Sequence, residues 1–379
     1  MDRWPVEVGE SGALLVTNIP NYPLRFRPLL KEKVWGGHAL EPLVGEACTE
    51  RHIGEAWLIH ESLPVQNGPL QGRTLAEVVR DFPQEMLGVH GAGFVVDGVA
   101  RFPLLAKFLD AEDWLSVQLH PNDGQARARE GVPYGKCEFW YVLDAAPGAR
   151  VIHGLTQKLR PDELIRAART GAIRDMFDTV AVSADDVLIN THGMIHALGP
   201  GLRIYELQQS SDITYRLYDW DRPASDGREL HLEQSAAIAD YEPVLAHTIT
   251  PIEYSSSNGT ETRMLAACRY FAATLKRITD IDTSNTRSAS PHLLTVLSGA
   301  GAIQVRDERL ELRAGDSILV PAHVGEYTLF AADELRIITG FVPDLAKDIV
   351  RPLHAIGCSA AQIKQLGGDG TRSDLVGIA

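Results

Sequence analysis

The chain has 379 residues, 45% of them hydrophobic, so it can bury a large core, and its length predicts two or three domains. Its formal net charge is −14 and its Lys and Arg residues form no block, which argues against a protein that binds the phosphate backbone of nucleic acids. We see no secretion signal, no apolar run of the ~18–20 residues that a membrane helix needs, and four widely spaced cysteines, so we expect a cytoplasmic protein with no nucleic-acid or membrane partner.

Short runs of β-branched and aromatic residues follow one another along most of the chain. Gly, Pro, Asn and Asp separate them at the spacing found in sandwiches and barrels. The clearest runs are SVQLH (116–120), EFWYVLDA (138–145), RVIHGL (150–155), DVLIN (186–190), LRIYELQQ (202–209), TYRLYDW (214–220), LLTVLSG (293–299), AIQVRD (302–307), DSILVPA (316–322) and LRIITGFV (335–342). The sequence therefore predicts a mainly β protein.

Three segments break this pattern and predict helices inserted into the β frame. They are TLAEVVRDFPQEMLG (74–88), RPDELIRAARTGAI (160–173) and SAAQIKQLGG (359–368). Thr74 and Ser359 are expected N-caps, Pro83 should interrupt the first helix, and Gly171 should end the second.

A polar stretch, PIEYSSSNGTET (251–262), lies between two strand-rich halves and places a domain boundary near it. The halves share one pattern, because GDSILVPAHVGEYTL (315–329) has the layout of DDVLINTHGMIHALG (185–199), with Pro321 in the place of Thr191. We expect a catalytic first domain over 1–245, a second domain over 246–345 and a C-terminal tail over 346–379.

Two strand motifs group polar side chains on one face. In SVQLHPND, Gln118 and His120 are two apart and so point to the same side of a strand. In YGKCEFWYVLDA, the same alternation groups Lys136, Glu138 and Trp140. Taken alone, the first motif also fits a strand that ends at a hydrogen-bonded polar edge, and the second fits a solvated edge.

A third motif is NTHGMIHALGPGLRIYELQQ (190–209). His196 begins a strand, and the turn at 199–201 is expected to lead the chain back so that the next strand pairs with it. Glu206 would then lie nearly opposite His196. His192 precedes a turn-forming glycine, which favours an exposed side chain over a ligand.

Together, the three motifs offer two imidazole nitrogens, a carboxylate and an amide oxygen, on His120, His196, Glu138 and Gln118. Such a mixed set suits Zn²⁺ and would also accept Mn²⁺, Fe²⁺ or Co²⁺. Ligands on several strands of a barrel converge while the barrel mouth stays open to substrate. The combination predicts a metal site.

The same motifs carry a resemblance to a known family. With KVWGG (33–37), GEAWLIHESLP (54–64), FPLLAKFLDA (102–111), ITYRLYDWDR (213–222) and ELHLEQ (229–234), the sequence resembles the short bacterial form of type I mannose-6-phosphate isomerase, a metal-dependent cupin. The resemblance is strong over residues 25–235 and looser beyond. It implies two cupin-type, jelly-roll β-barrels with a few inserted helices.

The resemblance also implies roles for individual residues. It places the metal ligands at Gln118, His120, Glu138 and His196. It places the active-site arginine at Arg216, the lysine of a K-x-E element at Lys136, the positions that hold the phosphate end at Ser116 and Lys107, and acidic residues of the sugar pocket at Glu206 and Asp212.

The sequence departs from the family pattern at several positions. Asp185 and Thr191 replace the Gly and Pro of the second cupin motif, and Cys137 stands on the face away from the metal, where the family has Thr or Pro. In the second half, Glu326 and His292 occupy the positions of a ligand His and a ligand Glu, with no third ligand. We therefore expect a second barrel without a metal site.

The resemblance implies that the protein interconverts mannose 6-phosphate and fructose 6-phosphate through a cis-enediol. It also implies one bound divalent cation, for which Zn²⁺ is the first candidate. The partner would be a small sugar phosphate, and the protein a monomer or homodimer. Glu206 and Lys136 are the first candidates for the proton-transfer base, followed by His192. For Arg216, a structural ion pair with Asp219 or Asp212 is the alternative.

Two other functions fit a metal-binding cupin. A metal-dependent cupin oxygenase would favour an apolar pocket, whereas Lys136, Glu206, Asp212 and Arg216 would make this pocket polar. A non-catalytic sugar-binding cupin would need no proton-transfer residue, and would keep its binding without Glu206 and Lys136.

Overall fold

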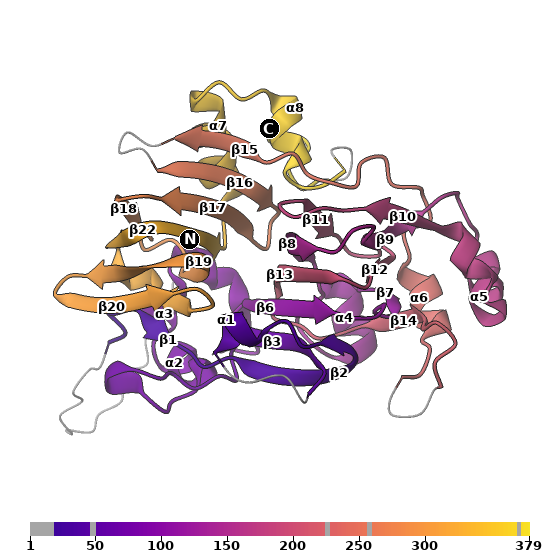
Figure 1. Ribbon diagram of the computed structural model, residues 1–379, viewed down its shortest axis with the longest axis horizontal. Coiled ribbons are helices and arrows are strands. Elements are labelled where there is room, and N and C mark those ends of the chain that lie inside the picture. Colours follow the sequence, from indigo (N-terminus) through magenta and orange to yellow (C-terminus); the bar gives the residue numbers. More distant parts are fainter. Residues whose placement is uncertain (1–18, 46–50, 224–227, 256–259, 370–372) are drawn as a thin grey trace.

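The protein is mainly β, as predicted, and its strands lie in layers (Figure 1). The computed structural model describes residues 19–45, 51–223, 228–255, 260–369 and 373–379. The first residues of the chain, Cys48 and part of the expected boundary stretch lie outside these ranges. Within them, no helix combines the length and apolar composition needed to cross a membrane.

The first half contains two antiparallel sheets that face each other. The six-stranded sheet has the order β11-β8-β13-β6-β2-β3 and the five-stranded sheet the order β10-β9-β12-β7-β14. The strands of the six-stranded sheet are β2 (Leu29–Gly37), β3 (Ile53–Ile59), β6 (Leu104–Ala111), β8 (Glu138–Ala145), β11 (Val187–Asn190) and β13 (Leu202–Gln209). Those of the five-stranded sheet are β7 (Val117–Leu119), β9 (Arg150–Leu155), β10 (Phe177–Ala181), β12 (His196–Leu198) and β14 (Tyr215–Tyr218).

The second half is one curled sheet, called here the second barrel. It has the order β1-β21-β19-β22-β17-β16-β15, with β18 paired to β22 and β20 to β19. Its strands are β1 (Leu24–Arg25), β15 (Ile252–Ser255), β16 (Glu261–Ala267), β17 (Ala272–Ile278), β18 (Ile281–Asn285), β19 (His292–Val305), β20 (Glu308–Arg313), β21 (Ser317–Val320) and β22 (Glu326–Phe341). A separate ribbon pairs β4 (Val95–Val96) with β5 (Val99–Ala100).

One strand of the second barrel differs from the prediction. Two runs that we expected as separate strands, 293–299 and 302–307, form parts of the single strand β19. Its register shifts at Gly299, whose φ is +84° and where an added Cβ would lie 1.9 Å from the carbonyl oxygen of Glu334. The glycine therefore marks a bulge within a strand, where the sequence suggested a turn.

The helices are short and mostly confirm the expected caps. They are α1 (Glu41–Val44), α2 (Leu75–Asp81), α3 (Pro83–Leu87), α4 (Asp123–Glu130), α5 (Pro161–Thr170), α6 (Leu232–Ile238), α7 (Arg351–Ala355) and α8 (Ala360–Gln365). The 3₁₀ turns are η1 (Gly68–Leu70), η2 (Val89–Phe94), η3 (Ala172–Met176) and η4 (Ala322–Val324), and η5 (Leu345–Val350) is a π-helical turn. Thr74 and Ser359 cap α2 and α8, Pro83 separates α2 from α3, and Gly171 ends α5 at a φ of +74°.

Helix α4 was not predicted, because it carries almost no apolar periodicity. Only Ala126 of its residues is buried. Its sequence signal is a capping box, in which the side chains of Asn122 and Gln125 each accept a hydrogen bond from the other's backbone N–H.

Strand alternation divides the molecule into layers. The outer face of the five-stranded sheet packs against α5 and α6, at the right of Figure 1. The outer face of the six-stranded sheet, including Phe139 and Tyr205, packs against the second barrel and the tail helices α7 and α8 in one continuous core. Between the two facing sheets, an apolar cluster around Trp140 and Leu198 fills one end, and the polar side chains of the site occupy the other. The limits proposed for the three domains remain a prediction.

Candidate active site

Three buried side chains from both facing sheets converge between them. His120, immediately after β7, and His196 on β12 belong to the five-stranded sheet, and Glu138 on β8 belongs to the six-stranded sheet. His196 Nε2 lies 3.0 Å from Glu138 Oε1, and His120 Nε2 lies 3.7 Å from Glu138 Oε2. The donor atoms of all three lie within 4.8 Å of one another, and all three side chains are fully buried.

The ring orientations of the two histidines leave their Nε2 atoms directed at the centre of the group. The Nδ1 of His120 donates to the carbonyl of Ile213 at 2.7 Å, and the Nδ1 of His196 donates to that of Met194 at 2.9 Å. Among the described residues, neither Nε2 has a hydrogen-bond partner, and Glu138 Oε2 is paired only with charged neighbours. Burial, together with the charge of Lys136, holds the pKa of His120 well below its usual value, so this imidazole is neutral. Three buried side chains with potential ligand atoms arranged in this way fit a bound metal ion.

Glu138 is oriented by its neighbours. Asn190 Nδ2 donates to Oε1 at 3.2 Å, and Lys136 Nζ lies 2.9 Å from Oε2. Burial alone would raise the pKa of Glu138, but the charges of Lys136 and His196 hold it well below its usual value. The carboxylate is therefore ionised and held in place, as a ligand must be.

Gln118 lies on the same face as the two histidines. On β7 it is directly opposite His196 on β12 and Arg216 on β14, so the three side chains share one row across the sheet. The Gln118 side chain is half-buried. The structure thus brings three of the predicted ligands together and places Gln118 beside His196 on the adjoining strand, while its role as a ligand stays a prediction.

A second row crosses the facing sheet and pairs a lysine with a carboxylate. Glu206 on β13 is directly opposite Lys107 on β6 and Trp140 on β8. Lys107 Nζ lies 3.2 Å from Glu206 Oε1, and Trp140 Nε1 donates to Oε2 at 2.8 Å. Burial and the negative charge of Glu138 raise the pKa of Glu206, although Lys107 acts in the opposite direction.

The expected pairing of Glu206 with His196 is wrong. Strand β12 pairs with β7 and β9, whereas β13 pairs with β6 and β8 in the other sheet. The turn at 199–201 carries the chain from one sheet to the other, so Glu206 and His196 lie in facing sheets.

Several residues of this region were not singled out from the sequence. Glu55 on β3 accepts a hydrogen bond from Trp57 Nε1 at 2.7 Å and lies 2.9 Å from Lys33 Nζ and 3.8 Å from Lys107 Nζ. Lys31 Nζ lies 3.3 Å from the centre of the Trp57 ring. The signal was present in GEAWLIHESLP, since strand alternation places Glu55 and Trp57 on one face.

The remaining predicted residues lie around this group or away from it. Ser116 is buried directly before β7, and Asp212 is exposed, with its charge acting on Lys31 and Lys107. Arg216 Nη1 donates to the carbonyl of Glu229 at 3.0 Å, and its Nε lies 4.0 Å from Asp219, which also binds Arg222 and Arg228.

His192, the third candidate for the base, lies elsewhere. Its Nε2 is 3.2 Å from Gln209 Oε1, and its ring packs edge-on against Tyr270, on the side of the sheet that carries Cys137. His192 is therefore not part of the group around Glu138.

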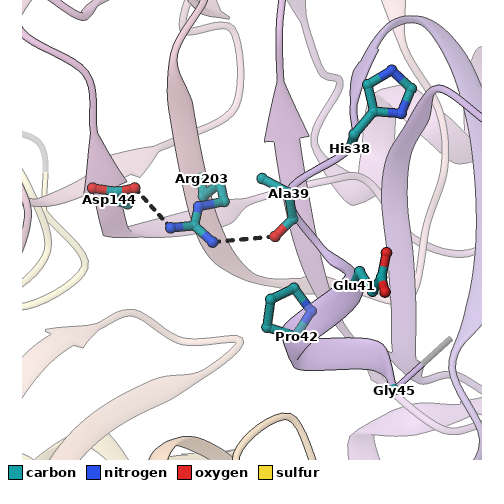
Figure 2. Close-up of a pocket in the computed structure, with 7 residues that line it drawn as sticks. All are labelled: His38, Ala39, Glu41, Pro42, Gly45, Asp144 and Arg203. Carbon is teal, nitrogen blue, oxygen red and sulfur yellow. Dashed lines mark hydrogen bonds and ion pairs between the residues drawn. The ribbon is translucent and has the colours of Figure 1, made fainter. Parts of the chain in front are cut away.

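A separate recess of about 710 Å³ contains none of the predicted site residues. Figure 2 shows its lining, which is His38, Ala39, Glu41, Pro42, Gly45, Asp144 and Arg203. Arg203 crosses it and donates to Asp144 at 2.7 Å and to the carbonyl of Ala39 at 3.1 Å. The guanidinium of Arg203 is thus already hydrogen-bonded to groups of the protein at both of its terminal nitrogens.

Known proteins share both halves of this chain. Residues 24–141 match the phosphomannose isomerase type I catalytic domain, and residues 260–339 match the cupin domain of mannose-6-phosphate isomerase. The chain is 34% identical over 327 residues to "Probable mannose-6-phosphate isomerase GmuF" of Bacillus subtilis, which covers 83% of this chain and 98% of that protein. It is 36% identical over 307 residues to the mannose-6-phosphate isomerase of Streptococcus mutans, covering 79% of this chain and 92% of that protein.

A solved structure agrees with these sequence relatives. The crystal structure of the mannose 6-phosphate isomerase from Bacillus subtilis matches with a TM-score of 0.75 and 29% identity, over 84% of this chain and 99% of that chain. The predicted cupin fold is thereby confirmed. The chain belongs to the type I mannose-6-phosphate isomerase family.

Proposed function

We propose that this protein interconverts mannose 6-phosphate and fructose 6-phosphate through a cis-enediol, with one divalent cation held by Gln118, His120, Glu138 and His196. The observation that carries the proposal is that buried side-chain atoms of His120, Glu138 and His196 lie within 4.8 Å of one another, and that among the described residues neither imidazole Nε2 has a hydrogen-bond partner. Family membership supplies the substrate, and these residues supply the chemistry.

Zn²⁺ suits this site best. Two imidazoles with a carboxylate are a common ligand set of catalytic zinc, and an open coordination position beside them can take substrate or water. When bound, the ion acts as a Lewis acid that polarises the oxygens on the two reacting carbons. Asn190 and Lys136 hold Glu138 in the orientation needed for binding.

Glu206 is the proposed base that moves the proton between C2 and C1. A base of this kind works best when its pKa approaches the working pH, and burial beside Glu138 raises the pKa of Glu206 in that direction. Trp140 and Lys107 contact its two oxygens and fix the carboxylate. Lys136 is the second candidate, although its Nζ is only 2.9 Å from Glu138.

The substrate phosphate requires cationic or hydrogen-bonding groups away from the reacting carbons. We assign this role to Arg216 and Ser116, and place Asp212 at the rim of the sugar pocket. Lys107, expected at the phosphate end, lies between the carboxylates of Glu206 and Glu55, which would repel a phosphate. We therefore propose that Lys107 acts on the substrate mainly by positioning Glu206.

The test is turnover of mannose 6-phosphate before and after chelation, with Zn²⁺, Mn²⁺ and Co²⁺ added back separately. Loss of turnover on chelation and its return with one of these ions would support the proposal. Binding of sugar without turnover by the folded, metal-loaded protein would favour a binding cupin instead. Uptake of O₂ with iron bound would favour an oxygenase.

A further inference from the structure

The second barrel contains a cavity that the isomerase reaction does not use. Its volume is about 460 Å³, within the range of small-molecule sites. Along the inward faces of β17, β19 and β22, polar side chains at the cavity give way to apolar ones farther in, such as Leu294 and Ile337. The barrel is thus packed at one end and polar and hollow at the other.

Three side chains that line the cavity can each form a further hydrogen bond. Thr274 on β17 and Thr339 on β22 are directly opposite each other, are 7% and 6% exposed, and line the cavity. Within the described part of the chain, neither hydroxyl has a hydrogen-bond partner. His292 bonds through Nδ1 to the Tyr327 hydroxyl at 2.8 Å, and its Nε2 likewise has no partner there. Because all three residues line the cavity, these groups are available to hydrogen-bond a molecule that enters it.

The charges around the cavity do not select an anion. Lys276 Nζ is bound to Asp282 at 2.6 Å and to Ser284 at 2.7 Å, so its charge is neutralised within the barrel. Arg287 and Glu326, which also line the cavity, are exposed and of opposite sign, and the carboxylate of Asp348, a further lining residue, lies 3.9 Å from His90 Nε2. Positive and negative groups therefore both lie around the cavity, which fits a ligand without net charge.

The first half of the chain also contributes to the wall of the cavity. His90, on η2, also lines the cavity; its backbone N–H donates to the carbonyl of Ala289 at 2.9 Å, and its Nδ1 donates to that of Val342 at 2.8 Å. The cavity is thus bounded by both halves. Phe341 and Tyr327 add aromatic surface to the hydroxyl and imidazole groups.

We propose that this cavity binds a neutral monosaccharide. A sugar ring presents hydroxyls, which suit Thr274, Thr339 and His292, and C–H faces, which suit the aromatic rings. The site lies in the second barrel and is independent of the proposed metal group.

Equilibrium dialysis of the full-length, zinc-loaded protein with radiolabelled D-mannose and D-fructose tests the proposal. The double variant Thr274→Val/Thr339→Val removes both hydroxyls and keeps the side-chain shape, so we expect binding to weaken about tenfold or more. Isomerase turnover should stay at the wild-type level. Thr328→Val, the same change on β22 at a residue that does not line the cavity, should leave binding unchanged.

His292→Leu is a second, independent variant, which keeps the test possible if the double variant folds poorly. We expect it to weaken sugar binding as well. Failure of both free sugars to bind the wild-type protein would overturn the proposal, as would equal binding by wild type and both cavity variants. The 6-phosphates of the same sugars form the comparison arm, with Arg287→Gln. Binding that needs the phosphate and is lost with Arg287→Gln would overturn the assignment of a neutral ligand.

Discussion

Lys107 and Glu206 lie directly opposite each other on β6 and β13, with Nζ and Oε1 3.2 Å apart and both side chains only 3% exposed. The second oxygen of Glu206 accepts a hydrogen bond from Trp140. Both oxygens are therefore fixed by neighbours on adjacent strands. A carboxylate held in this way can face a reacting carbon without first having to be ordered.

Replacing Glu206 tests the assignment of the base. Glu206→Gln keeps the size of the side chain and removes its ability to take a proton, so kcat should fall by about 10²–10⁴-fold. Zinc content, measured by mass spectrometry, should stay at the wild-type level. Glu112→Gln, the same change at an exposed residue, is the control and should leave kcat unchanged. Wild-type turnover by a zinc-loaded Glu206→Gln variant would move the role of base to Lys136.

Asn190 should strengthen metal binding without touching the ion. It donates a hydrogen bond to Glu138 Oε1, and loss of such a supporting contact commonly weakens metal affinity by about 10–100-fold. Asn190→Leu should show this loss in a competition titration with a zinc chelator. His196→Ala, which removes a proposed ligand, should weaken binding further. An unchanged affinity in Asn190→Leu would show that this contact does not hold Glu138 for the metal.

His292 should make the folding stability depend on pH. Burial, with the charges of Lys276 and Arg287, lowers the pKa of folded His292 to about 3. Between pH 6.5 and 3 the unfolded chain therefore binds a proton that the folded chain does not, and the free energy of unfolding falls with falling pH, by up to about 1.4 kcal/mol per pH unit. In urea unfolding at pH 7 and pH 5, His292→Leu should lose less stability than wild type. Equal losses would contradict this assignment.

The continuous core between the two halves predicts that they unfold together. Phe139 is fully buried where the six-stranded sheet packs on the second barrel, and Phe139→Ala should cost about 3–5 kcal/mol. All six tryptophans precede residue 245, so their fluorescence reports on the first half. Hydrogen exchange in β17 and β22 reports on the second, and both probes should show the same loss of stability. A loss confined to the fluorescence would mean that the halves unfold separately.

Strand alternation allowed much of the site to be predicted. It groups Gln118 with His120, and Lys136 with Glu138, because a period of two needs only one strand to be identified. Pairing between strands is a property of the whole chain, and the assignment of Glu206 to the same sheet as His196 failed for this reason. The turn at 199–201 has the composition of a hairpin, but the outward-facing apolar residues of β12 and β13 belong to different layers.

The contacts of Glu55 illustrate the same limit. Its motif was recognised, but its contacts with Lys33 and Lys107 join β3 to β2 and β6. Nothing local to residues 54–64 specifies these partners. Gly299 shows a further limit, since glycine in a sequence fits a turn and a bulge equally well.

Strand β1 supplies the edge of the second barrel by pairing with β21, although more than two thirds of the chain lies between the two strands. During synthesis β1 leaves the ribosome early, and its partner strand β21 becomes available only after most of the chain has been synthesised. The second half expressed alone would lack this strand and expose β21 as a free edge, open to pairing with other chains. Within the described residues, the earliest strand of the chain therefore cannot reach its final partner until β21 has been synthesised.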